Sequence, residues 1–474
     1  MPRPSRLALL LAATCAFSAP ALADDLREAL VLAYNTNPQL QAARAQQRAV
    51  DENVPIQRAE GLPGASATAT YSEFLKTSFA TPNSPDRQVS GQVSLGVPIY
   101  SGGGVKNAVR AAETRVEAGQ ADLRGIESGV FSQVVAAYLD VILNEAVVGL
   151  QNNLVQVLDV NLRATADRFE IGDLTRTDVA QSQSRLELAK GDARAAEANL
   201  IAARERYIQL VGKPPQGLEA PPPLPGLPAS PAEAVAAALD DNPDLIAARE
   251  RAKASEFDID VAGSTRLPRV EVFTSGSYSD FMGTMGGRAS AGFDQASTGA
   301  TAGVRATIPI FQGGRPAALR RQAQARASAA METEIATERD VIAQVRAAYS
   351  AWKAADEIIA TTQTAVDAAA LSLEGVRAEN SVGNRTILDI LDAEQELLRA
   401  RVRLVTARRN AYVAGFSLLS AMGRAEAQDL GLDGGPLYDP AANYDRVKGR
   451  INDWASDPAP KPAGTRTVDT PVGG

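Results

Sequence analysis

The chain has 474 residues, of which 22% are charged, 45% hydrophobic and 5% aromatic, and this length exceeds that of a typical single domain. It contains no histidine, which excludes His-dependent catalytic triads, imidazole general bases and His-ligated metal sites. The net charge of −8 and the isoelectric point of about 5.0 argue against a nucleic-acid partner.

Residues 1–23 predict a secretory signal peptide. Arg3 and Arg6 precede a short apolar stretch, and Ala21-Leu22-Ala23 matches a cleavage site before Asp24. The apolar stretch is shorter than the roughly 20 residues that a membrane-spanning helix needs. An uncleaved signal anchor is the alternative. We therefore expect an exported protein whose mature chain lacks Cys15, the one cysteine, and so holds no disulfide.

The rest of the chain is internally duplicated. Asn37-Pro38 recurs as Asn242-Pro243, 205 residues later, and Val97-Pro98-Ile99-Tyr100 recurs as Ile308-Pro309-Ile310-Phe311, 211 residues later. The offset of 211 persists to the end of the repeat, so two tandem copies of one unit are the economical interpretation. The copies span 24–225 and 226–424.

Each copy starts with a helical stretch, at 26–58 and 231–262, and continues with a region that has strand chemistry. Apolar and polar residues alternate through 89–99 and again through 304–310, which is typical of a strand with one apolar face. Their upstream partners lie at 65–74 and 270–282, and loops rich in Gly, Ser and Asn separate the partners. These four strands predict two β-hairpins, at about 63–100 and 268–312.

A long helical hairpin follows each β-hairpin, at about 102–212 and 315–423. The first helix is proline-free and runs to about Glu170, so some 65 residues give a helix of roughly 100 Å. The returning helices repeat apolar residues every seven positions, which indicates coiled-coil packing. The rows are Val179, Leu186, Ala193, Leu200 and Tyr207, then Ile390, Leu397, Leu404, Ala411 and Leu418. The tail, 425–474, is rich in Gly, Pro and Asp and is expected to be irregular.

This order of elements predicts a mainly α-helical fold with a transmembrane β-barrel portion. No stretch of the mature sequence approaches 18 consecutive apolar residues, so we expect no transmembrane helix. Four strands cannot close a barrel, and an open edge in lipid leaves backbone groups unpaired. Chains must therefore pool strands, and because side chains fill an eight-stranded barrel, a conduit favours three or more chains.

The chain resembles the TolC family of outer-membrane efflux proteins. The resemblance covers about 24–423 and rests on the duplication, on 97–103 and 308–314, and on the glycine-centred turns. Its most specific segment runs from Ser381 to Ala393. The resemblance implies a homotrimer with a twelve-stranded barrel in outer-membrane lipid and a twelve-helix periplasmic tunnel. It also implies a periplasmic adaptor protein, an inner-membrane pump of RND or ABC type, and service in multidrug efflux or type I secretion.

The resemblance further implies an entrance gate at the helical turns. Arg385 is expected to bond toward Thr177 on a neighbouring coil, and Asp178 is expected to be a second member of the lock. The family's usual partner for that aspartate is a tyrosine, whose position is occupied here by Asn380, so the second link is an amide-to-carboxylate contact or a weaker one.

Asp389 and Asp392 lie one helical turn apart and share a face. In a trimer they would form two stacked rings of three carboxylates, which favour cations at a constriction. The alternative interpretation is that they are solvated charges on a helix surface. The turns themselves are expected to contact the adaptor, although glycine in a helix–helix turn needs no partner to explain it. The turn residues are Ile171, Gly172, Leu174, Val382, Gly383 and Arg385.

Two other functional classes compete for this sequence. A periplasmic coiled-coil adaptor or structural protein without a barrel accounts for the helices, but not for two alternating hairpins of matched sequence. An enzyme would need a nucleophile, metal or cofactor motif, and the sequence contains none. The glycines at 102–104 lack the Lys-Ser/Thr of a phosphate-binding loop and favour a bend. The sequence does not name the cargo, pump or adaptor.

Overall fold

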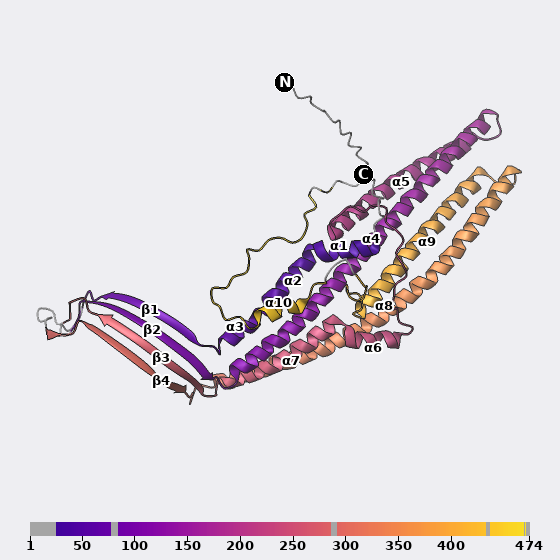
Figure 1. Ribbon diagram of the computed structural model, residues 1–474. Helices are drawn as coiled ribbons and strands as arrows, with labels where there is room; N and C mark the ends of the chain where they lie inside the picture. Colours follow the sequence, from indigo (N-terminus) through magenta and orange to yellow (C-terminus); the bar gives the residue numbers. More distant parts are fainter. Residues whose placement is uncertain (1–24, 77–83, 286–291, 433–436, 469, 471–474) are drawn as a thin grey trace, which may run out of the picture.

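A computed structural model describes residues 25–76, 84–285, 292–432, 437–468 and 470. The predicted signal peptide and parts of both hairpin loops therefore lie outside the described residues. The described chain is elongated, with a four-stranded sheet at one end and the tips of two helical hairpins at the other (Figure 1).

The sheet is antiparallel throughout, in the order β1-β2-β3-β4. Its strands are β1 (Gly64–Glu73), β2 (Arg87–Tyr100), β3 (Arg269–Asp280) and β4 (Ala296–Thr307). The predicted strand at 304–310 is wrong in its bounds, because β4 begins earlier and ends at Thr307. Pro309 has no N–H for the ladder. Pro98, its counterpart, is retained in β2 at an irregularity between Pro98 and Tyr100.

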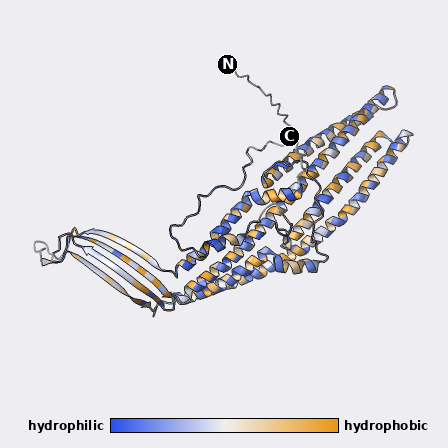
Figure 2. Ribbon diagram, in the orientation of Figure 1, coloured by the Kyte–Doolittle hydropathy of each residue, from blue (hydrophilic) through white to orange (hydrophobic). Residues whose placement is uncertain are grey.

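One face of the sheet is apolar and the other polar. Val97, Val272 and Val304 pair across β2, β3 and β4 on the apolar face. The neighbouring positions are polar and bond to one another: Ser66 Oγ lies 2.8 Å from Ser94 Oγ, and Arg305 Nη1 lies 2.7 Å from Glu271 Oε1. Figure 2 shows hydrophobic residues recurring along the strands and the long helices. The sheet thus has the two-sided character of a barrel wall in lipid.

The short helices differ from the sequence prediction of one continuous stretch per copy. The first stretch is split into α1 (Leu26–Thr36), α2 (Pro38–Asp51) and α3 (Asn53–Ala59), and the second into α6 (Pro231–Asp241) and α7 (Pro243–Ser264). The breaks at Asn37 and Asn242 arise because a residue before proline is disfavoured in the α region. The break between α2 and α3 falls at Glu52. Both asparagines are extended, and their side chains cap the following helix.

The long helices are α4 (Gly104–Glu170), α5 (Arg176–Val211), α8 (Arg315–Ser381) and α9 (Ile387–Ala421). α4 and α8 have 67 residues each, which corresponds to about 100 Å. Members of the seven-residue rows are buried between the paired helices, including Leu186, Ala193, Leu397 and Leu404. Coiled-coil packing therefore continues along both hairpins.

By length and composition, α4 is the one helix among the described residues that could cross a membrane; its most apolar 18-residue window has a mean hydropathy of 1.5. The sequence prediction did not single out this helix. The middle of α4 carries Val130, Phe131, Val134 and Val135, which are all buried in the largest core cluster. Of the most apolar window itself, 33% is buried inside the described chain.

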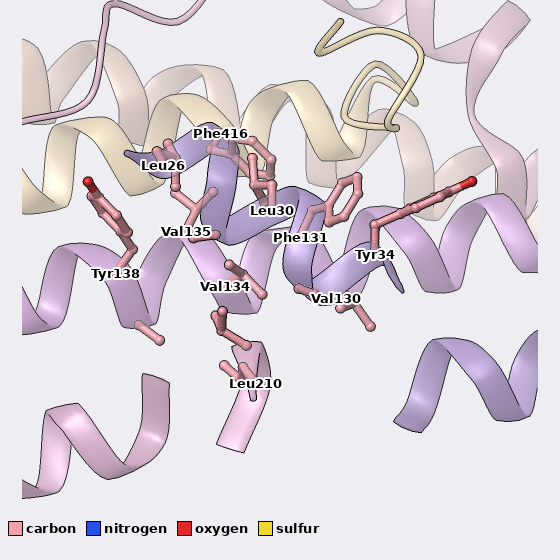
Figure 3. Packing of buried hydrophobic residues seen from close by; sticks show 14 of the residues in the cluster. Leu26, Leu30, Tyr34, Val130, Phe131, Val134, Val135, Tyr138, Leu210 and Phe416 are labelled. Atoms are coloured by element: carbon pink, nitrogen blue, oxygen red, sulfur yellow. The ribbon is translucent and has the colours of Figure 1, made fainter. Parts of the chain in front are cut away.

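Figure 3 shows the packing of that core from close by. Leu26, Leu30 and Tyr34 of α1 pack against the buried stretch of α4, with Leu210 from α5 and Phe416 from α9 beside them. The returning helices thus end in a shared core with the short N-terminal helix.

The tail is not irregular throughout, so that expectation is wrong. It contains α10 (Pro440–Val447), which packs beside α2, and Asn443 Nδ2 donates to Asp51 Oδ2 at 2.7 Å. Ala425 and Leu432 are buried in the main core. The sequence missed this because α10 has eight residues, which is too short for a periodic pattern to be recognised, and is held by tertiary contacts.

Candidate functional site: the tips of the helical hairpins

The two hairpin tips have the same backbone design. α4 ends at Glu170 and α8 at Ser381, and each is followed two residues later by a glycine, Gly172 or Gly383, with φ of +83° and +82°. Glycine adopts this left-handed conformation without the steric cost of a Cβ. The next helix then starts with a capping box at each tip, made by Thr175 with Asp178 and by Thr386 with Asp389.

Two of the carboxylates that the sequence predicts for the gate and the constriction, Asp178 and Asp389, are members of the capping boxes. Asp178 Oδ2 accepts from the Thr175 backbone N–H at 2.8 Å and from its hydroxyl at 2.7 Å, and Asp389 repeats both distances with Thr386. These hydrogen bonds from threonine stabilise the charged form, so the pKa of each aspartate is lowered. Both groups are therefore ionised at neutral pH.

Arg385 is held within its own tip. Its Nε donates to Glu379 Oε2 at 2.7 Å, and Nη1 lies 3.8 Å from Asp389 Oδ1. The carboxylate of Glu379 is the main reason why the pKa of Arg385 is raised. Asn380 Nδ2 donates to the Arg385 carbonyl at 2.7 Å.

The predicted gate links are not formed within the single chain. Among the described residues, no hydrogen bond joins Arg385 to Thr177 or Asn380 to Asp178. Thr177 is exposed on the first turn of α5. The physical reason is proximity: Glu379 and the Arg385 carbonyl belong to the same short turn and are reached without crossing to another hairpin. Contacts between protomers stay a prediction.

Asp392 does cross between hairpins. Its Oδ1 lies 2.7 Å from Arg185 Nη2 on α5, and Arg185 Nη1 donates to Gln395 Oε1 at 2.8 Å. A forked guanidinium thus joins α5 to two positions one turn apart on α9. The two predicted carboxylates therefore have different partners in this chain. Asp389 accepts from its helix cap and lies 3.8 Å from Arg385 of its own tip, whereas Asp392 pairs at 2.7 Å with Arg185 of the other hairpin.

Apolar packing supports the same crossing point. Leu391 is buried against Leu158, Leu186 and Ala189, which come from α4 and α5. This cluster and the Arg185 fork lie close to the tips, where the two hairpins of the chain meet. A separation of the hairpins must break both.

The outermost residues of the tips are exposed and partly apolar. Ile171 is 80% exposed and Val382 is 70% exposed. Gly172 and Gly383 are also exposed, whereas Leu174 is half-buried. A Cβ added at either glycine would meet no neighbouring atom within 4 Å, so the space beside the turns is open. The tips present small apolar surfaces that a partner protein can cover.

Sequence reasoning missed Arg185, Gln395 and Glu379. Their charges are visible in the sequence, but the register between α5 and α9 is not, so nothing in the pattern pairs Arg185 with Asp392. The spacing of Asp392 and Gln395, one turn apart, is the one signal of a shared face. No group of three or more Asp, Glu, Cys or His side chains in the described part of the chain is arranged to hold a metal ion.

Comparisons with known proteins agree with this architecture. The family model described as outer membrane efflux protein matches residues 29–213 and 234–424, which are the two copies of the repeat. Outer membrane efflux protein BepC of Brucella suis biovar 1 (strain 1330) is 33% identical over 445 residues, covering 93% of this chain and 94% of BepC. Outer membrane protein TolC of Escherichia coli (strain K12) is 26% identical over 430 residues, with 87% and 85% covered.

A solved structure shares the fold. The outer membrane channel CmeC of Campylobacter jejuni superposes with a TM-score of 0.75 at 17% identity, over 90% of each chain. The duplicated sequence, the amphipathic sheet and the two capped helical tips are thus accounted for by one family. The chain belongs to the outer membrane efflux protein family.

Proposed function

We propose that three copies of this chain form an outer-membrane exit duct for a tripartite efflux or type I secretion system. The observation that supports this most directly is the sheet, which has one apolar face, one polar face and outer strands β1 and β4 that each pair with a single neighbour in the described chain. Three such sheets supply twelve strands and close the edges that lipid would otherwise leave unpaired. The helices continue the wall into the periplasm.

The gate is proposed to lie at the tips. Arg185 and Asp392 hold the two hairpins of one protomer together, while Arg385 and Thr177, with Asp178 and Asn380, act between coils. Asp389 and Asp392 are proposed to line the constriction, where rings of carboxylates favour cations. Arg185 lies 2.7 Å from Asp392, whereas Arg385 lies 3.8 Å from Asp389. The charge of Asp392 is therefore offset more strongly, and Asp389 contributes the larger share of the negative field.

The adaptor is proposed to engage the turns around 171–174 and 382–385. Their exposed apolar residues, Ile171 and Val382, offer surface to cover, and the adjoining gate couples that contact to opening. The inner-membrane pump selects the cargo, because a passive duct of this kind discriminates little between the molecules that pass through it. The family consists of channel and transport proteins, and we propose that this chain has no catalytic role.

The competing function is a periplasmic coiled-coil protein without a barrel. Such a protein has no use for a sheet whose apolar face carries Val97, Val272 and Val304 in register. Extraction with alkaline carbonate separates the two functions, because it releases a peripheral protein and leaves a barrel in the membrane pellet. Light scattering of the detergent-solubilised material should give the mass of three chains. Release by carbonate as a monomer would reject the duct.

A further inference from the structure

A basic groove of about 510 Å³ lies between α3, the start of α4 and α10. Arg58, Lys106, Arg110 and Lys448 line it, against one lining carboxylate, Glu113. This concentration of positive charge is unexpected in a chain of net charge −8. The groove belongs neither to the candidate gate nor to the tips.

Three of the four cations have no carboxylate partner. Lys448 Nζ is paired with Asp445 Oδ1 at 2.6 Å, whereas Arg58, Lys106 and Arg110 form no ion pair with any carboxylate that the structure describes. Lys106 and Arg110 are exposed and lie four residues apart on one helix, an arrangement of like charges that weakens the helix slightly. An anion seated between them would remove that repulsion.

The groove lies at the level of the lipid headgroups. β2 ends at Tyr100 and α4 begins at Gly104, so Lys106 and Arg110 lie about 3 and 9 Å along the helix from its start. Ile99, Tyr100 and Phe311 are exposed at this junction, as expected where an apolar band meets the interface. Each headgroup layer is roughly 5–8 Å thick, and long basic side chains extend further toward phosphates.

The groove and the polar face of the sheet adjoin different sides of α4. A separate hollow at the same junction is lined by Gly96, Glu271 and Arg305, which lie on the polar face of the sheet. From α4, that hollow is lined by Val105 and Ala108, whereas the basic groove is lined by Lys106 and Arg110. The two share no lining residue. The polar face lines the barrel interior, so the groove faces the surrounding membrane.

The floor of the groove suits a lipid better than a free ion. Val54, Val109 and Tyr444 form it, and they continue into a small buried cluster. An amphiphile can lay apolar surface on this floor while its phosphate meets the cations at the rim. α10 supplies Tyr444 and the adjoining Lys448, which gives the helical part of the tail a role.

We infer that this groove binds the phosphate headgroup of an anionic phospholipid of the periplasmic leaflet. The inference goes beyond the duct function and rests on its placement of the sheet in the membrane. Binding there would tie α3, α4 and α10 to the membrane surface just below the barrel. Lys106 and Arg110 are the main phosphate contacts.

Native mass spectrometry of the mature, full-length trimer in detergent tests this inference. The delipidated trimer is mixed with equal amounts of phosphatidylglycerol and phosphatidylcholine that carry identical acyl chains. We expect a preference for phosphatidylglycerol of about thirty-fold, the effect of two surface cations on an anionic headgroup. Lys106→Gln with Arg110→Gln should reduce the preference to near one.

The matched control is Lys190→Gln with Arg194→Gln, an exposed pair with the same residue types and spacing on α5. It should keep the wild-type preference. Equal retention of the two lipids by the wild type overturns the inference, and this result does not depend on whether the groove variant assembles. A groove variant that keeps the wild-type preference also overturns it. Full displacement by a large excess of inorganic phosphate would assign the groove to a soluble anion instead. Channel conductance should be the same in the groove variant, so failure here leaves the duct function standing.

Discussion

Arg185 on α5 and Asp392 on α9 form an ion pair of 2.7 Å between Nη2 and Oδ1 that joins the two helical hairpins of one chain close to their tips. Gln395, one turn further along α9, accepts from the second nitrogen of the same guanidinium at 2.8 Å. Separating the two hairpins at their tips must break both bonds. This fork therefore opposes opening within one protomer.

Replacing Arg185 by alanine should favour the open entrance. The pair is partly exposed, so its loss corresponds to about a two- to five-fold increase in the open population. The change is measured as the mean conductance of single channels in planar bilayers. Arg163→Ala is the control, because Arg163 pairs with Asp159 within α4 and joins no second hairpin. Equal increases in the two variants would remove the special role of Arg185.

Variants of Arg385 and Glu379 distinguish a contact between neighbouring coils from a contact within one tip. Arg385→Ala should raise conductance, because it removes the cation proposed to reach Thr177 on a neighbouring coil. Glu379→Gln should leave conductance unchanged, since it frees Arg385 from a bond that is local to the turn. The same bilayer recordings test both variants. If the two variants behave alike, Arg385 acts only through its own tip.

Asn37 and Asn242 should be equivalent in stability. Asn37 Nδ2 donates to the Leu210 carbonyl at 3.0 Å, and Asn242 Nδ2 donates to the Ala421 carbonyl at 2.9 Å. Alanine at either position removes a helix cap and leaves a carbonyl unpaired, at a cost of about 1–3 kcal/mol. Thermal melts followed by circular dichroism measure the loss. The loss of stability should exceed that caused by Asn153→Ala, a substitution at an exposed position. A loss no greater than that of Asn153→Ala would contradict the capping role.

Glu127 should make the helical region less stable as the pH rises. Burial raises its pKa, with Glu426 and Asp429 adding to the rise and Arg44 opposing it. The folded state then binds more protons than the unfolded state just above the ordinary glutamate pKa, so stability falls through that window and stays lower above it.

Glu127→Gln keeps an oxygen that can accept from the Ala427 N–H, which lies 2.7 Å from the carboxylate, and removes the charge. The melting temperature of this variant should exceed that of the wild type at pH 8, and the two should coincide near pH 3, where the carboxyl group is protonated in both states. A gain of the same size at both pH values would show that charge is not the cause.

Much of the fold follows from the sequence because its signals are local and are repeated. Period-two alternation identified the strands, and the seven-residue rows containing Leu186 and Leu397 identified the paired helices. The breaks at Asn37 and Asn242 were present in the sequence as Asn-Pro pairs, but the continuous helical composition on both sides concealed them. α10 and the buried Leu432 depend on contacts with helices some 400 positions away, which no local pattern records.

The site was less predictable for the same reason. Turn glycines and capping threonines are local, so the positions of both tips could be found in advance. The partner of Asp392 depends on the register between α5 and α9, and the local bonds of Arg385 and Asn380 depend on the exact geometry of one turn. The links proposed between protomers, from Arg385 to Thr177 and from Asp178 to Asn380, stay predictions.

The most direct test of the central claim is a planar-bilayer recording of the purified, membrane-extracted wild-type trimer. A duct that is closed at its tips and lined by Asp389 and Asp392 should give small current steps with a reversal potential that shows cation selectivity. The absence of steps from folded trimer, or steps selective for anions, would contradict the account.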